Sequence, residues 1–196
     1  MGDRERGPAD AFAQAGELIR GIHGSKPFNL AAVRDVADLA VKETYNAGGR
    51  VTVNEIWDIM RSRPGRTGWL GPTELDNNHC IPKDSCLRRL IELDLPGAEQ
   101  PEIEFEMVAI QDEMPGCLIE KTRHQTSRGG VRRSFHDLEK AMMKADSQEY
   151  LTKQSLIDDL ERVWIRYNDL YGEADGFDYM KVWNECLRFF DEQGLR

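Results

Sequence analysis

The sequence lacks the long apolar run that a membrane-spanning helix needs, which is about 18 residues or more. Its first dozen residues are polar and show no apolar segment of a secretory signal, so we expect a cytoplasmic protein. The motifs GxxxxGK[ST], GxGxxG, HExxH and GxSxG are also missing, which excludes the common phosphate-binding, dinucleotide, zinc-protease and serine-hydrolase signatures. We therefore expect no membrane contact, no cofactor and no enzyme of a recognisable class.

Cysteine is scarce, and no CxxC pair occurs. The four cysteines are Cys80, Cys86, Cys117 and Cys186. The candidate zinc ligands are His79, Cys80 and Cys86 with Cys117 and His124 or His136, but structural zinc sites use two closely spaced ligand pairs. A Cys80 nucleophile with His79 as its base is the enzyme hypothesis, although adjacent residues rarely reach that geometry. The simpler interpretation is reduced, buried thiols without a metal.

Charge is unevenly distributed along a chain whose net charge is −9. Residues 99–120 contain seven acidic side chains and no basic one, whereas residues 121–133 contain five basic side chains and no acidic one. An acidic protein repels nucleic acid and anionic lipid as a whole. Local charge, rather than the total, therefore selects the partner.

Apolar residues at intervals of three and four predict most of the fold as helix. The predicted helices cover residues 11–21, a segment from Leu30 through Tyr45 that ends at Gly48-Gly49, residues 54–62, 83–93 and 135–144, a segment beginning near Thr152 or Ser155, and a last segment from Tyr179 to Phe190. Thr52 with Glu55, and Ser134 with Asp137, have the spacing of helix N-terminal caps. The aromatic residues of the last two helices predict a large core.

Strict alternation of charged and apolar residues over Glu102–Met107 predicts a half-buried strand within 102–110. Residues 117–122 would pair with it across the turn at 111–116. Helix, loop, helix and hairpin is the order of a winged helix. We therefore predict a mainly α (α+β) fold with one hairpin, divided into a tail with a short helix (1–27), a winged-helix-like domain (28–122), a basic linker (123–133) and a C-terminal helical unit (134–196).

The segment from residue 30 to 110 resembles a family of small winged-helix-like proteins carried by phages and prophages. The matching residues are Gly49-Arg50, Val51-Thr52, Ile56-Trp57, Met60-Arg61, Leu75, Asn77-Asn78-His79, Arg89-Leu90-Ile91-Glu92, Pro96 and Phe105-Glu106. Asp84-Ser85-Cys86 departs from the small or aromatic residues expected there. The resemblance implies a fold and, for a phage protein, the host cytoplasm; it implies no catalytic residue.

The first functional hypothesis is a non-enzymatic DNA-binding or regulatory protein. In a winged helix, cations of the second helix contact the groove or the phosphates, and a basic, Gly-containing segment can clamp a nucleic-acid strand. The candidate nucleic-acid-binding residues are Lys83, Arg88, Arg89, Lys121, Arg123, Arg128, Arg132 and Arg133. Internal neutralisation of these cations by the neighbouring acids is the competing interpretation.

The alternative hypothesis is an acidic protein-interaction module, an adaptor or an inhibitor, including one that imitates DNA. It would bind a protein partner through the acidic hairpin or through the C-terminal helices, and a homodimer is one form of such contact. An enzyme of unrecognised type is the second alternative.

Overall fold

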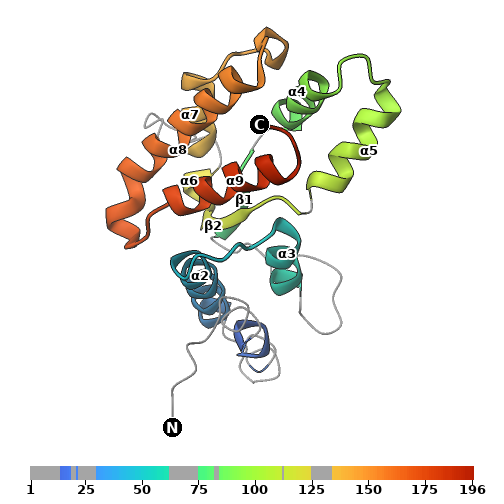
Figure 1. Ribbon diagram of the computed structural model, residues 1–196. Coiled ribbons are helices and arrows are strands. Elements are labelled where there is room, and N and C mark those ends of the chain that lie inside the picture. Colours follow the sequence, from blue (N-terminus) through green and yellow to red (C-terminus); the bar gives the residue numbers. More distant parts are fainter. Residues whose placement is uncertain are drawn as a thin grey trace.

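The computed structural model of the chain describes residues 14–18, 21, 30–61, 75–81, 84–111, 113–124 and 134–196. These residues form a mainly helical fold with one small antiparallel sheet, which confirms the predicted fold class (Figure 1). The elements are α2 (Leu30–Asn46), α3 (Val53–Arg61), β1 (Leu75–His79), α4 (Asp84–Asp94), α5 (Gln100–Gln111), β2 (Gly116–Glu120), α6 (Lys121–His124), α7 (Phe135–Met142), a 3-10 turn η1 (Ser147–Glu149), α8 (Lys153–Asp175) and α9 (Met180–Glu192).

The helix starts predicted from capping residues are confirmed. The Glu55 N–H donates to the Thr52 hydroxyl at 3.2 Å, and the Thr52 N–H donates to the Glu55 carboxylate at 2.8 Å, which forms a complete capping box. Ser134 and Asp137 form the same box at the start of α7. The Thr152 hydroxyl accepts from the Ser155 N–H at 3.2 Å and caps α8. These starts depend on residues three apart, so the sequence alone determines them.

The sheet consists of two strands that are far apart in the sequence. β1 and β2 pair antiparallel in a register that runs from Leu75 opposite Glu120 to His79 opposite Gly116. Helices α4 and α5 lie between these strands in the chain, so the sheet is not a hairpin. In Figure 1 α8 lies above the sheet, α9 crosses in front of it, α2 and α3 lie below it, and α4 and α5 lie to one side.

The predicted strand within 102–110 is wrong, because these residues belong to helix α5. The helix buries Ile103, Met107 and Ile110, which are spaced by four and three residues and so share one face. Phe105, which alternation places on the same side as Ile103 and Met107, is instead 73% exposed. A short alternating run fits both a strand and a helix. Here the apolar residues continue to Ile110 at a helical spacing, which indicates the helix.

The strand that pairs with β2 lies in a segment predicted as a loop. The sequence pattern Asn77-Asn78 favours turns because asparagine side chains bind their own backbone. In the structure Asn78 is fully buried in β1 and lies opposite Cys117. Pairing with a distant strand outweighs the local preference at this position.

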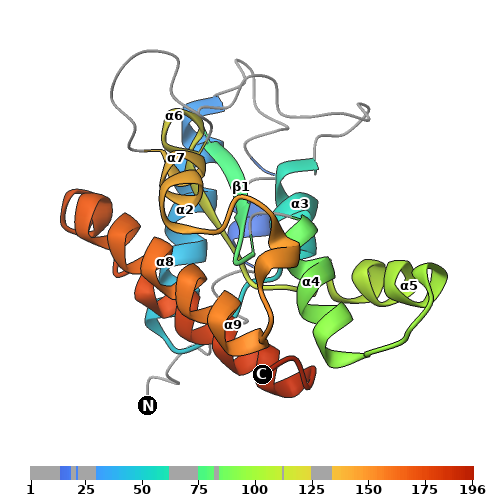
Figure 2. The same cartoon turned by 90° about the horizontal axis from the view of Figure 1, so that it is seen from above.

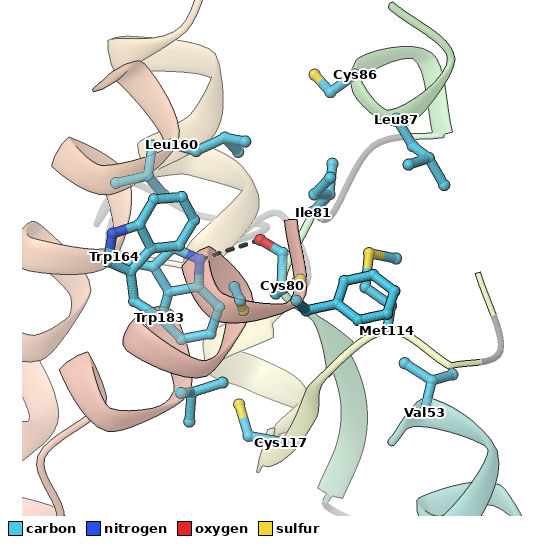
Figure 3. Packing of buried hydrophobic residues seen from close by; sticks show 14 of the residues in the cluster. Val53, Cys80, Ile81, Cys86, Leu87, Met114, Cys117, Leu160, Trp164 and Trp183 are labelled. Carbon is cyan, nitrogen blue, oxygen red and sulfur yellow. Dashed lines mark hydrogen bonds between the residues drawn. The ribbon is translucent and has the colours of Figure 1, made fainter. Parts of the chain in front are cut away.

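The core is continuous from Ala37 on α2 to Leu195 after α9, and it includes residues of both predicted units. The large aromatic side chains of α8 and α9 belong to this core, as predicted: Trp164, Tyr167, Trp183, Phe189 and Phe190 are at most 1% exposed. The indole N–H of Trp164 donates to the carbonyl oxygen of Cys80 at 3.1 Å, which attaches α8 to the end of β1 (Figure 3).

Two buried tyrosines, Tyr45 and Tyr167, differ in whether their hydroxyl groups are hydrogen-bonded, so they provide a matched test of what such a bond contributes to stability. The Tyr45 hydroxyl donates to the carbonyl oxygen of Gly116 at 2.8 Å and also lies 3.1 Å from that of Val51, whereas the buried Tyr167 hydroxyl has no hydrogen-bond partner among the described residues. We expect Tyr45→Phe to lower the free energy of unfolding by about 1–2 kcal/mol, because it removes a buried hydrogen bond. Tyr167→Phe should leave it unchanged or raise it.

The measurement is urea unfolding of both variants, followed by circular dichroism. Both substitutions keep the ring and remove one oxygen, so each variant serves as the control for the other. Equal losses of stability in the two variants would contradict the hydrogen-bond assignment.

Candidate functional site

Arg88, one of the predicted nucleic-acid-binding residues, connects two helices of this chain. From α4 it donates to the side-chain oxygen of Gln100 at 3.0 Å and forms an ion pair with Glu104. Both partners belong to α5. The Arg88 guanidinium therefore holds α5 against α4.

Arg89 and Arg123 are also engaged within the chain. The Arg89 guanidinium donates to the backbone carbonyl of Tyr150 at 2.9 and 2.8 Å, and its side chain is 15% exposed. Arg123 on α6 pairs with Asp175 at 2.7 Å and stacks over the Tyr171 ring at 4.6 Å. Arg89 also pairs with Glu92 at 3.2 Å. These cations therefore have partners within the molecule, as the competing interpretation of the basic residues expects.

The side chains of the other predicted nucleic-acid-binding residues are not described by the structure. Lys83, Arg128, Arg132 and Arg133 lie outside the described residues, and Lys121 is placed only as the first residue of α6. Each of the three candidate arginines that the structure describes contacts a different part of the molecule. Arg88 contacts α5, Arg89 contacts the residue that follows η1, and Arg123 contacts the end of α8.

The candidate zinc ligands and the candidate nucleophile are mostly enclosed. All four cysteines are free thiols with at most 3% of their surface exposed. Burial raises the pKa of the Cys117 and Cys186 thiols, which disfavours the reactive thiolate. His124 and His136 lie together, with ring centroids 4.7 Å apart, far along the chain from His79. Within the described part of the chain no group of three or more metal-ligating side chains has a geometry that can hold a metal ion.

The burial of the thiols predicts their reactivity. We expect the native protein to react only slowly with Ellman's reagent at pH 8, because the reagent needs an exposed thiolate. In denaturant all four cysteines should react at once. One thiol that reacts rapidly in the native protein would contradict this arrangement and would support the enzyme hypothesis.

A groove lies between the end of α4 and the first turns of α5, and its volume is about 670 Å³. Its lining residues are Asp94, Leu95, Pro96, Ala98, Pro101, Glu102, Phe105 and Glu106. Five of these eight residues are apolar, and the three acidic ones belong to its two helices. We call this feature the α4–α5 groove.

An exposed apolar strip continues from the groove along α5. Phe105 is 73% exposed, and Val108, one helical turn further on, is 68% exposed. Leu95 on the opposite side of the groove is 41% exposed. The alternation of charged and apolar residues hides this strip, because it assigns Phe105 to the core. The spacing of Ile103, Met107 and Ile110 is the signal that places Phe105 outside.

The surroundings of the groove are negatively charged. Glu99, Glu102, Glu104, Glu106 and Glu113 lie on or beside α5, and residues 99–113 include no lysine or arginine. Arg88 neutralises Glu104, and Lys153 pairs with Asp94 at 2.6 Å. Glu102 accepts the Glu99 N–H at 2.9 Å, which caps α5. Among the described residues no cation pairs with Glu102 or Glu106, so the groove keeps a net negative rim.

Helix α5 is attached to the molecule along one side only. Figures 1 and 2 both show it at the edge of the molecule, with α4 between it and α8. Its buried face packs on α4, and its opposite face carries Phe105 and Val108. The exposed strip is therefore open to a partner without any rearrangement of the fold.

Comparisons of this chain with protein-family models, with curated proteins and with solved structures gave no match. None of the described helices is long and apolar enough to cross a membrane. We therefore base the function on the α4–α5 groove and its surroundings.

Proposed function

We propose that this protein is a protein-interaction module that binds a partner through the α4–α5 groove. The observation that carries the proposal is the exposure of Phe105, at 73%, beside a groove that is lined mainly by apolar side chains. Aromatic side chains next to a preformed hollow are typical anchors of protein interfaces.

The cost of leaving this strip in water supports the proposal. Burying one large apolar side chain contributes about 1.5–3 kcal/mol. Phe105 and Val108 gain little of this within the chain, since both remain more than two thirds exposed. A partner that covers them together with Leu95 recovers that free energy, and rigid helices keep the ordering cost of binding low.

Charge favours a protein partner over nucleic acid at this surface. The groove is bordered by Glu102 and Glu106, which repel phosphate. The described arginines that the DNA-binding hypothesis used are paired with Glu104, with the Tyr150 carbonyl and with Asp175. DNA binding would therefore depend on cations other than these three.

The proposal predicts the effect of removing the strip. The double variant Phe105→Ser/Val108→Ser should fold normally, because both side chains are exposed. It should capture at least about tenfold less of the partner from an extract of the source cells than the unaltered protein does, as expected when an interface anchor is removed. The measurement is affinity capture with quantitative mass spectrometry of the bound proteins.

Leu39→Ser is the matched control, because Leu39 is 56% exposed on α2, which packs on β2 and α9 and does not line the groove. Its capture profile should equal that of the unaltered protein. A double variant that captures the same proteins in the same amounts would contradict the proposal. Competition by duplex DNA for the same proteins would favour the DNA-binding or DNA-mimic alternatives.

A further inference from the structure

We infer that the partner segment that occupies the α4–α5 groove is a cationic amphipathic helix. This inference rests on the proposed function and specifies the chemistry of its partner. It follows from the shape of the groove, from the hydrogen-bonding groups that the groove offers and from its charge.

The apolar surface is longer than the groove itself. Leu95 and Phe105 line the hollow, and Val108 extends the same surface by three residues along α5, a rise of about 4.5 Å. A small molecule would fill the hollow and leave Val108 exposed. An elongated ligand with several apolar side chains along one face covers the whole strip.

The groove also favours a helix over an extended peptide. A β-strand-like segment binds by adding to a sheet edge that accepts and donates its backbone hydrogen bonds. The groove is formed by two helices and their connection, and β1 and β2 do not line it. A segment that lies here has to satisfy its own backbone groups, and a helix does so internally.

The charge around the groove selects a cationic partner. Glu102 and Glu106 border the hollow, and Glu99 adds a further negative charge at the start of α5. Two described cations that contact these helices are committed to other acceptors, since Arg88 pairs with Glu104, and Lys153 pairs with Asp94 and the Gly194 carbonyl. Lysines and arginines that flank the apolar face of a partner helix would pair with Glu102 and Glu106, whereas an acidic helix would be repelled.

The test uses three synthetic peptides and fluorescence anisotropy, with the full chain as the receptor. The first peptide is an amphipathic helix with leucines and phenylalanines on one face and lysines on its flanks. The second has the same composition in a scrambled order that has no apolar face. The third replaces each lysine of the first with glutamate. We expect the first to bind saturably and at least about tenfold more tightly than the other two, more weakly as salt rises.

Two variants of the protein separate charge from apolar contact. Glu102→Gln/Glu106→Gln should weaken the first peptide by about tenfold, and the glutamine at position 102 still accepts the Glu99 N–H that caps α5. Phe105→Ser should weaken it by at least as much, as expected for an aromatic anchor. Circular dichroism of both variants checks that α5 is retained.

Equal binding of the first and scrambled peptides, or unchanged binding to the glutamine variant, would overturn the inference. Tighter binding of the acidic peptide that Phe105→Ser abolishes would overturn it as well, while leaving the proposed function intact. Self-association of the chain that Phe105→Ser removes, measured by analytical ultracentrifugation, would identify a second copy as the occupant and also overturn it.

Discussion

The hydrogen bond from the Trp164 indole to the Cys80 carbonyl joins the two halves of the sequence, and the rest of the fold is arranged around it. Cys80 is the residue that follows β1, and its N–H donates to the carbonyl of Pro115 at 3.1 Å, just before β2. One residue therefore connects both strands with α8. The buried aromatic side chains of α8 and α9 belong to the same core, and their apolar burial helps to stabilise a small two-stranded sheet.

Helix α5 lies outside this arrangement, and that position has consequences for function. It is inserted between the strands in the sequence but packs at the edge of the molecule, where Arg88 and a single buried face hold it to α4. A helix can bury only one of its faces against one neighbour. With Ile103, Met107 and Ile110 on the buried face, Phe105 and Val108 remain in solvent beside an acidic groove. The candidate interface thus follows from the way α5 packs.

The sequence was sufficient where a few neighbouring residues decide the structure. The capping boxes at Thr52 and Ser134, and the buried aromatic residues of α8 and α9, could be predicted because their signals lie within one or two helical turns. The pairing of β1 with β2 could not, since the two strands lie on either side of α4 and α5 and asparagines favour a turn at β1. The candidate site was missed for a related reason: the alternation over Glu102–Met107 fits a strand, and only the wider pattern through Ile110 shows which face of a helix is buried.

The conformation of α5 and the exposure of Phe105 are best tested by placing one cysteine at position 105 and, separately, one at position 107. The four native thiols are buried, so a rapid reaction reports the new cysteine alone. In a strand, residues 105 and 107 lie on the same face and react alike, whereas in α5 residue 105 faces solvent and Met107 is 7% exposed. The structure predicts one equivalent of fast-reacting thiol in Phe105→Cys and none in Met107→Cys. Equal rates at the two positions would contradict the helix, the exposed strip and the interface built on it.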